Sequence, residues 1–219
     1  SGGTGNDSLE GGAGNDLLQG GAGSDVLTGG DGDDRFGILT GDGADTITGG
    51  ETGETLGDLL DASGMTAGAT LTLASAESGT LVSGADSISF TEVERILLGA
   101  GNDSVTGSAG NDSVDAGAGN DTLTGGAGND ALFGGGGNDL IHGNAGDDSF
   151  YGASGIDSFF GGTGRDTINF TSAASSVTAN LGTGLSGTNI TGAVSIDGDG
   201  GSDTLSNIEN FTGEQPQAP

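Results

Sequence analysis

The sequence predicts an all-β fold: a right-handed parallel β-solenoid of two repeat blocks, each followed by a strand-rich insert or cap. Three observations support this prediction. Residues 98–169 consist of eight nine-residue units without any insertion. In every one of them position four is glycine and position six is aspartate, and position eight is always apolar. Low complexity alone does not hold three residue types in a fixed register, so the period argues against a disordered chain.

Each unit reads as a turn followed by a short strand. Its last three residues alternate polar, apolar and polar, which places one side chain on the inner face. The first six form the turn, where glycines allow positive φ and a close approach of carbonyl groups. Two units would make one coil of 18 residues, and stacked coils would give parallel strands with two columns of turns. The expected inward side chains at position eight are Leu9, Leu18, Leu27, Phe36, Ile47, Val105, Val114, Leu123, Leu132, Ile141, Phe150, Phe159 and Ile168.

The first repeat block is less regular than residues 98–169. Four units are followed by two extra residues, Ile38 and Leu39, and then by a fifth unit, TGDGADTIT. The next unit, GGETGETLG, is degenerate, with Glu54 in the aspartate position and Thr52 in place of a glycine. We therefore expect the regular stack to end at this unit.

Two segments interrupt the repeats. Alternating apolar residues at 70–73 and 87–90 predict half-buried strands, and FTEVERILLG at 90–99 fits either a helical turn or another strand. The segment after residue 169 repeats the pattern of the first interruption, so the architecture is duplicated. The predicted divisions are a first repeat block at 1–57, an insert or cap at 58–97, a second repeat block at 98–169, and a cap with a linker-like tail at 170–219.

The formal net charge of -29 restricts the possible partners. There is no lysine, and the three arginines are Arg35, Arg95 and Arg165. Nucleic acids and anionic membranes would be repelled, whereas cations would be attracted. The absence of cysteine excludes disulfides and zinc–thiolate sites. No apolar run approaches the ~20 residues that span a bilayer, so direct membrane insertion is not expected. We expect Arg35 and Arg165, in or beside turns, to offset negative charge locally.

The stacked coils would place the aspartate of each unit beside the aspartate two units later, about one strand spacing (~4.8 Å) away. These anionic side chains would repel one another unless a cation lies between them. Calcium accepts six to eight carbonyl and carboxylate oxygens in loose geometry, whereas magnesium demands a tighter octahedron. No histidine or thiolate cluster is available for a transition metal. Turn formation alone also favours aspartate, but it does not explain an invariant carboxylate in so acidic a chain.

The unit G-G-x-G-x-D-x-U-x, with U apolar, resembles the RTX, or hemolysin-type, calcium-binding repeat family. Thirteen good units carry the resemblance over more than half of the chain. It implies a parallel β-roll that holds about eight calcium ions between the turns of alternate repeats. It also implies ligation by turn carbonyls and by the position-six aspartates Asp7, Asp16, Asp25, Asp34, Asp45, Asp103, Asp112, Asp121, Asp130, Asp139, Asp148, Asp157 and Asp166.

Eight aspartate pairs follow from this resemblance. They are Asp7 with Asp25, Asp16 with Asp34, Asp103 with Asp121, Asp112 with Asp130, Asp121 with Asp139, Asp130 with Asp148, Asp139 with Asp157, and Asp148 with Asp166. The irregularity around Ile38 argues against a ninth pair, Asp25 with Asp45. Substitutions at position two are expected to weaken the sites that they border; these are Ser108, Asn144 and Ala153.

Four further carboxylates stand in or beside the inserts. Asp86 and Asp203 follow a glycine at position-six spacing, which makes each of them either an outlying ligand or a structural residue. Glu94 and Glu209 occupy matching places in the two inserts. For both glutamates we expect a structural hydrogen bond or a cap, with calcium ligation as the alternative.

No catalytic site is expected in this segment. His142 is the only histidine, and no G-x-S-x-G motif accompanies the many serines and aspartates. The carboxylates could suggest a glycosidase pair, but their strict repetition indicates one repeated role. We expect His142 to be an exposed strand residue.

The resemblance implies a module of a secreted bacterial protein, exported by a type I secretion apparatus through its parent chain. It would fold on meeting extracellular calcium and be monomeric as a segment. The chain begins inside a repeat, so we expect it to belong to a longer protein. One alternative is an adhesive or surface-layer segment, although positions seven and nine lack the regular threonine arrays of an ice-binding face. Another is an accessory domain of an upstream enzyme or toxin.

Overall fold

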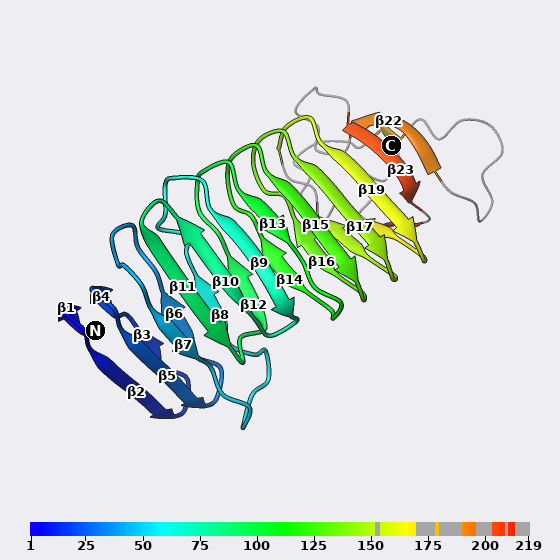
Figure 1. The fold of residues 1–219 in the computed structure, drawn as a ribbon. Helices are drawn as coiled ribbons and strands as arrows, with labels where there is room; N and C mark the ends of the chain where they lie inside the picture. The colour runs from blue at the N-terminus through cyan, green and yellow to red at the C-terminus, as the bar shows by residue number, and fades with distance from the viewer. Residues whose placement is uncertain (152–153, 170–177, 180–189, 196–202, 209, 213–219) are drawn as a thin grey trace, which may run out of the picture.

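The fold class predicted from the sequence is confirmed. The computed structural model describes residues 1–151, 154–169, 178–179, 190–195, 203–208 and 210–212, and every regular element in these ranges is a strand. The coils follow one another along a β-roll from β2 to β23 (Figure 1). The described residues include no helix that is long and apolar enough to cross a membrane.

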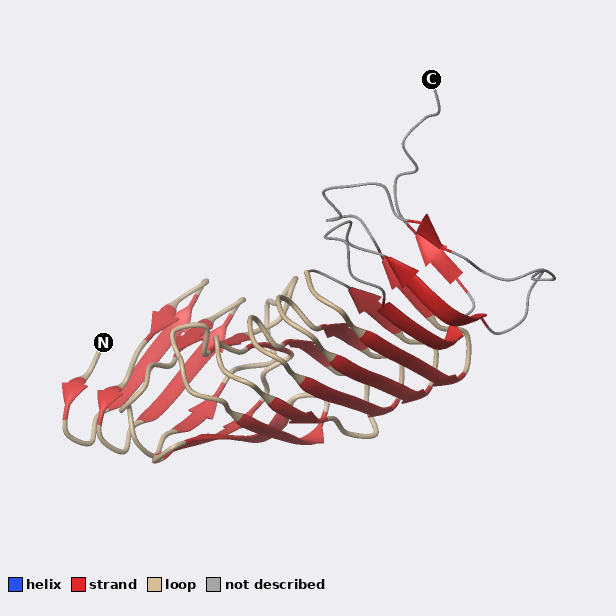
Figure 2. Ribbon diagram, turned by 90° about the horizontal axis from the view of Figure 1, so that it is seen from above, coloured by secondary structure: helices blue, strands red, loops and turns tan. Residues whose placement is uncertain are grey.

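Two sheets form the walls of the roll, and turns join them along its edges (Figure 2). Among the described strands, thirteen make what we call the long sheet and nine make the short sheet. In spatial order, the long sheet contains β2 (Ser8–Ala13), β5 (Val26–Asp31), β7 (Thr46–Thr48), β11 (Asp86–Thr91), β10 (Ser78–Ser83), β9 (Thr70–Ser75), β13 (Ser104–Thr106), β15 (Thr122–Ala127), β17 (Leu140–Ala145), β19 (Ser158–Thr163), β23 (Asp203–Ile208), β22 (Ile190–Ser195) and β21 (Thr178–Ala179). The short sheet contains β24 (Asn210–Thr212), β20 (Thr167–Asn169), β18 (Ser149–Tyr151), β16 (Ala131–Phe133), β14 (Ser113–Asp115), β12 (Arg95–Leu97), β8 (Leu59–Asp61), β6 (Arg35–Gly37) and β3 (Leu17–Leu18). A further pair, β1 (Gly3–Thr4) with β4 (Gly21–Ala22), joins two turns of the first block.

Successive repeats alternate between the two sheets, and strands of the same sheet pair in parallel one coil apart. Val105 in β13 is opposite Leu123 in β15, and Val114 in β14 is opposite Leu132 in β16. Position eight therefore stacks on position eight in both sheets. This register follows from the 18-residue coil, because a shift by one residue would turn every apolar side chain outward.

The core is the space between the sheets, and the position-eight side chains fill it. All thirteen of them are buried except Leu9, which is partly buried in the first coil. Phe150 from the short sheet meets Phe159 from the long sheet edge to face, with ring centroids 5.9 Å apart. The outer faces carry stacked aromatic pairs at position nine, Phe133 with Tyr151 and His142 with Phe160. His142 is a strand residue as predicted, but the prediction that it is exposed is wrong, because it is half-buried against the ring of Phe160.

The expectation that the regular stack ends at the degenerate unit is wrong. In the short sheet, β8 pairs in parallel with β6 on one side and with β12 on the other. In the long sheet, β11 pairs in parallel with β7 and β9 pairs in parallel with β13, while β10 lies antiparallel between them. The predicted strands at 70–73 and 87–90 belong to β9 and β11, and β12 shows that the stretch 90–99 is not a helical turn. The insert extends the stack because the outer strands of the insert present backbone N–H and C=O groups along their edges. The neighbouring repeat strands pair with these groups in parallel.

The topology of the two inserts supports the predicted duplication. The last insert strand in the long sheet pairs in parallel with the preceding repeat strand in each case, β11 with β7 and β23 with β19. The chain then crosses to the short sheet, where β12 pairs with β8 and β24 pairs with β20. β22 pairs antiparallel with β23 and with β21, and the other residues of the second insert and the tail lie outside the described residues.

The buried position-eight column predicts a local stability effect. Phe150 is 0% exposed, and we expect Phe150→Ala to lower the free energy of unfolding by ~3–5 kcal/mol, because it leaves a cavity between the sheets. Urea unfolding in saturating calcium measures this change. Leu17, which is 62% exposed, is the control, and Leu17→Ala should change the free energy by less than about 0.5 kcal/mol. Equal effects of the two substitutions would contradict the assignment of position eight to the core.

Candidate metal sites

The position-six carboxylates form ladders that connect successive coils. In each case, the backbone N–H of one aspartate donates a hydrogen bond to Oδ1 of the aspartate one coil later. Asp121 N–H, for example, lies 2.9 Å from Oδ1 of Asp139. The eight predicted pairs are all brought together in this way, with N···O distances of 2.7–3.0 Å. The alternate-repeat register predicted from the sequence is therefore the register of the fold.

The pair argued against from the sequence, Asp25 with Asp45, is also formed. Asp25 N–H donates to Oδ1 of Asp45 at 2.9 Å, although 20 residues separate them. The two extra residues form a local turn of their own, in which Leu39 N–H donates to Asp42 Oδ2 at 2.6 Å. Because this turn takes up the additional length, the strand that follows keeps its register with the coil below.

The assignment of Glu54 to the aspartate position is wrong, since Asp58 takes that place. Asp34 N–H donates to Oδ1 of Asp58 at 2.7 Å, across 24 residues. Residues 55–57 fold over Asp33, whose carboxylate accepts hydrogen bonds from their three backbone N–H groups and from Thr55 Oγ1, and this lowers the pKa of Asp33. The sequence signal for this arrangement was Asp58-Leu59-Leu60, which fits D-x-U once four residues are allowed to loop out.

The short-sheet ladder continues into the first insert through Glu94. Asp58 N–H donates to Oε2 of Glu94 at 2.6 Å, so Glu94 accepts the expected hydrogen bond. Its longer side chain occupies the place that aspartate holds in the repeats. On the long-sheet side the ladder is interrupted. The group that donates to Oδ1 of Asp103 there is Ala69 N–H, at 2.7 Å, and not the N–H of an aspartate.

The outlying carboxylates differ from the ladder. Asp86 accepts hydrogen bonds from the backbone N–H groups of Gly41 and Gly43, at 2.8 and 3.0 Å, so it holds a turn of the fifth unit. Asp203 immediately precedes Thr204, which pairs with Ser158 of the neighbouring strand. Asp157 likewise precedes Ser158, so the two aspartates hold equivalent places in the backbone. The side chain of Asp203, like the whole of Glu209, lies outside the described residues.

A second ladder runs along position five, and the sequence reasoning missed it. There the side chain of one coil accepts a hydrogen bond from the backbone N–H of the next coil, so this ladder runs in the opposite direction. Asn138 N–H donates to Asn120 Oδ1 at 2.8 Å, and Ile156 N–H donates to Asn138 Oδ1 at 2.8 Å. The sequence signal for this ladder is the asparagine that recurs just before the aspartate. It was interpreted only as a residue that favours turns. Arg165 N–H continues this ladder by donating to Asp147 Oδ1 at 2.8 Å.

The other oxygen of most ladder carboxylates is buried and accepts no hydrogen bond. A buried carboxylate oxygen without a partner is costly, since it has lost water and gained nothing. This recurrence along two columns, one at each turn edge, argues against a local packing fault and favours cation sites. Within the described residues, the Oδ2 atoms concerned belong to Asp7, Asp16, Asp25, Asp34, Asp45, Asp58, Asp103, Asp121, Asp130, Asp139 and Asp148.

Glycine at position one leaves room for these oxygens. A Cβ on Gly2 would lie 2.5 Å from Asp7 Oδ2 and 2.7 Å from the carbonyl oxygen of Gly20, one coil later. The same two kinds of oxygen would crowd a Cβ on Gly11, at 2.8 Å from Asp16 Oδ2 and 2.7 Å from the carbonyl oxygen of Gly29. A carboxylate and a carbonyl from adjacent coils thus converge on each such turn. This set of hard oxygen donors suits calcium.

The position-two substitutions have different consequences. The backbone N–H and Oγ of Ser108 donate to the carboxylate of Asp112, at 2.6 and 2.9 Å, so both carboxylate oxygens of Asp112 accept hydrogen bonds. Asn144 instead adopts φ of 78°, the left-handed conformation that glycine has at this position, and it leaves Asp148 Oδ2 without a partner. Ala153 lies outside the described residues.

Burial dominates the electrostatics of the ladders. It raises the pKa of Asp58, Asp121, Asp130 and Asp148 to about 6, against 3.8 in the ordinary carboxyl, even though each accepts a backbone hydrogen bond that favours the charged form. Neighbouring carboxylates of the same column add to the increase. The two ion pairs among the described residues, Arg35 with Asp61 and Arg165 with Asp147, lie outside the position-six columns.

Comparison with known proteins agrees with this geometry. The chain matches the family described as the RTX calcium-binding nonapeptide repeat (four copies) over residues 1–36, 38–52, 93–123, 124–159 and 151–169, more than half of its 219 residues. The matched ranges omit residues 53–92, which hold the looped part of the degenerate unit and most of the first insert. No curated protein matches the chain.

The raised pKa values predict how acidity affects the metal-free protein. Carboxyls with a folded pKa of about 6 bind more protons in the folded state than in the unfolded state, where the pKa is 3.8. The free energy of unfolding should therefore rise as the pH falls through 6 toward 4. Circular dichroism in calcium-free buffer should show more β structure at pH 4.5 than at pH 7.5. A β signal that grows with increasing pH would contradict this assignment.

Proposed function

Because the chain belongs to the RTX calcium-binding nonapeptide repeat family, we propose that its position-six carboxylates hold the calcium ions of this β-roll and that the ions drive its folding. The observation that carries the proposal is the pair of columns, one at each turn edge, of buried Oδ2 atoms without hydrogen-bond partners. Bound calcium would neutralise these charges and cross-link neighbouring coils. The residues that would hold the ions are the paired aspartates, together with the position-one glycines whose carbonyl groups face the same turns.

The expected sites follow the ladders. The eight pairs named from the sequence give about eight ions, and the added pairs Asp25–Asp45 and Asp34–Asp58 share the same geometry. We include both added pairs among the proposed sites. The Asp112 turn is a weaker candidate, because Ser108 already donates to its carboxylate.

Folding and metal binding should be coupled in this chain. The net charge is -29, and the fold buries a column of carboxylates at each turn edge. The metal-free fold thus concentrates like charges where water cannot screen them. Calcium binds only to the assembled turns, so its binding free energy becomes folding free energy.

This coupling suits a protein that must cross an envelope before it folds. Low calcium in the cytosol would leave the module unfolded for export by a type I secretion apparatus. External calcium at ~10⁻⁴–10⁻³ M, the range that extracellular modules use, would then fold it outside the cell. The module would serve the activity of its parent protein and carry no catalytic function itself.

A calcium titration followed by circular dichroism tests the proposal. We expect the β signal to be largely lost in excess chelator and to return cooperatively with calcium. Asp148→Asn removes one ladder charge while keeping an oxygen acceptor, and it should raise the midpoint calcium concentration on the order of tenfold. Asp147→Asn is a matched control, since neighbouring repeats carry asparagine at position five and the new amide oxygen could still accept from Arg165 N–H. A full β signal in chelator, or equal midpoints for the two variants, would overturn the proposal.

The Ser108 turn offers a gain-of-function test. Ser108→Gly restores the consensus and removes the Oγ donor to Asp112 Oδ1 but keeps the backbone N–H donor to Oδ2, so one carboxylate oxygen becomes available to a cation. We expect the midpoint calcium concentration for folding to fall, with Ser108→Ala giving a smaller change because it removes the hydroxyl but keeps a Cβ. The same titration measures both variants. A higher midpoint for Ser108→Gly would show that Ser108 supports the turn rather than competing with the ion.

A further inference from the structure

One stretch of the outer face of the long sheet carries a regular array of hydroxyl groups. Six neighbouring strands form it, in the spatial order β7, β11, β10, β9, β13 and β15 (Figure 1). Direct pairing aligns one outward hydroxyl residue from each strand, and we call this line the first row. The first row contains Thr46, Ser89, Thr80, Thr72, Thr106 and Thr124. All of them are exposed except Thr124, which is half-buried.

A second row runs beside the first, two residues away along the same strands except β7. It contains Ser87, Val82, Thr70, Ser104 and Thr122, all of which are exposed. Neighbours within a row are ~4.8 Å apart, and the two rows are about 6.6 Å apart. Val82, which is 43% exposed, places methyl groups among the hydroxyls. The face therefore repeats in two directions.

The hydroxyl rows end where apolar and aromatic residues replace them. On β5, Val26 stands opposite Thr46, and on β17, His142 stands opposite Thr124. The mixed outward residues expected from the repeats are thus found beyond this stretch. The array is divided in the sequence, because β9, β10 and β11 belong to the insert and only the other three strands belong to repeats.

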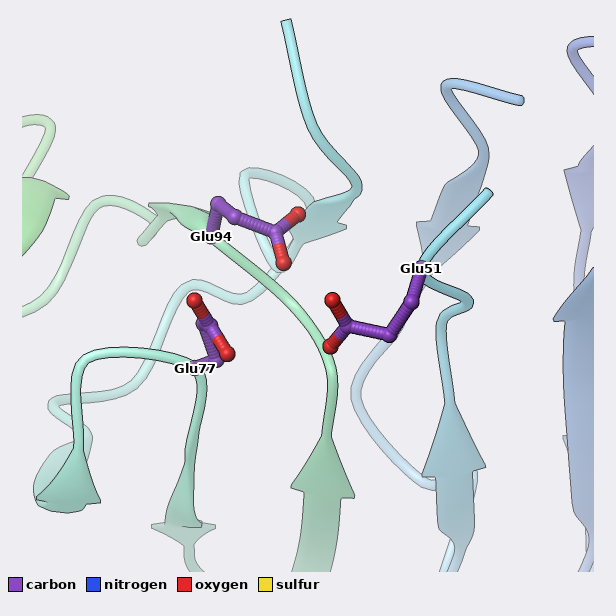
Figure 3. Close-up of side chains that lie close together, drawn as sticks. All are labelled: Glu51, Glu77 and Glu94. Carbon is purple, nitrogen blue, oxygen red and sulfur yellow. The ribbon is translucent and has the colours of Figure 1, made fainter. Parts of the chain in front are cut away.

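The array is neutral, although the formal net charge of the chain is -29. Neither row contains an acidic or basic residue. The acids nearest to the insert lie between strands, as Figure 3 shows for Glu51, Glu77 and Glu94, and one carboxylate oxygen of each lies within 4.8 Å of the other two. A charged partner would therefore be attracted or repelled elsewhere on the molecule.

The hydroxyl groups are fixed in position but are hardly used within the protein. Within the described part of the chain, the only side-chain hydrogen bond from the two rows is a long one, from Ser89 Oγ to the carbonyl oxygen of Asp45 at 3.5 Å. Threonine is stiff at χ1 because its β-carbon is branched, so its hydroxyl and methyl groups keep their places. The rows thus offer a preorganised set of hydrogen-bonding groups to an external ligand.

A rigid, uncharged and periodic array fits a ligand that is itself periodic. Protein partners depend on a few aromatic or arginine anchors, whereas serine, threonine and valine are under-represented among such anchors. Neither row contains an aromatic ring on which a sugar could stack. Water, in contrast, bridges to hydroxyl groups with little loss of binding enthalpy. Regularly spaced hydroxyl and methyl groups would hold such water molecules in the order of a lattice.

We propose that the two rows bind crystalline ice through a layer of water that they hold in register with the ice lattice. Each contact is weak, so binding depends on how many contacts are made at once. The insert and the flanking repeats are both required, because each supplies three of the six strands. This role goes beyond calcium binding, which we place at the turn edges and not on the face of the sheet.

Partition of the full chain into growing ice, in the presence of calcium, tests the proposal. The folded chain should be enriched in the ice over the remaining liquid and should open a gap between the melting and freezing points. Ser104→Tyr, in the middle of the second row, should abolish both effects, because the ring holds the lattice away from the neighbouring hydroxyls. Tyrosine suits a strand, so the fold should be retained. Circular dichroism at the same calcium concentration checks this.

Ser113→Tyr is the matched control. Ser113 holds position seven of the next repeat, as Ser104 does in its own, but it faces outward from β14 in the short sheet. This variant should leave both effects unchanged. Thr72→Tyr places the same ring on an insert strand, in the first row, and should abolish both effects as Ser104→Tyr does.

Three results would overturn the proposal. The first is no enrichment of the unmodified, folded chain in ice. The second is equal enrichment of the unmodified chain, Ser104→Tyr and Thr72→Tyr, or an equal loss in Ser104→Tyr and Ser113→Tyr. The third is retention of the chain on microcrystalline cellulose, a neutral polysaccharide probe, without any partition into ice. Loss of ice partition in Ser104→Tyr and Thr72→Tyr alone supports the proposal.

Discussion

The hydrogen bond from a backbone N–H to the carboxylate of the next coil is the interaction on which the rest of this fold depends. It uses one oxygen of each position-six aspartate to fix the stacking of turns, as between Asp121 and Asp139. It also buries that carboxylate and leaves the second oxygen without a protein donor. The fold thus leaves a buried, unpartnered carboxylate oxygen at most of the described turns, and a hard dication could neutralise its charge. Stacking, buried charge and the proposed dependence on calcium all follow from this one contact.

Glycine at position one gives this contact room in most units, although Leu98 and Ala116 hold that position before Asp103 and Asp121. At position one, the carboxylate oxygen and the carbonyl oxygen of the next coil occupy the space where a Cβ would stand, as at Gly2 and Gly11. Ser108 shows what happens when position two departs from glycine, since its N–H and Oγ satisfy Asp112 within its own turn. The second ladder at position five stacks the same turns through neutral amides and adds no charge in most repeats. The turn therefore separates two tasks, polar stacking at position five and charged stacking at position six.

The first insert shows how much variation the stack accepts. Successive ladder carboxylates are usually 18 residues apart, but the distance is 20 residues from Asp25 to Asp45, 24 from Asp34 to Asp58 and 36 from Asp58 to Glu94. Additional residues loop out as turns or add the β9–β10–β11 meander to the long sheet, after which the parallel pairing of the repeats resumes. Parallel pairing and inward apolar side chains define the path, so chain length between strands can change without loss of register.

The sequence by itself determined the features that repeat. The alternation at position eight identified the core, the period identified the β-roll, and the two-unit coil identified the eight aspartate pairs. These features are local, because each unit carries its complete pattern within nine residues. Tertiary structure decided what departs from the period: Asp58 in place of Glu54, the pairing of Asp25 with Asp45, and the entry of Glu94 into the ladder. It also assembled Glu51, Glu77 and Glu94, which lie far apart along the chain. Those outcomes depend on where extra residues loop out and on which strand edges meet. A local triplet such as Asp58-Leu59-Leu60 marks a strand, but it does not specify which strand edge it joins.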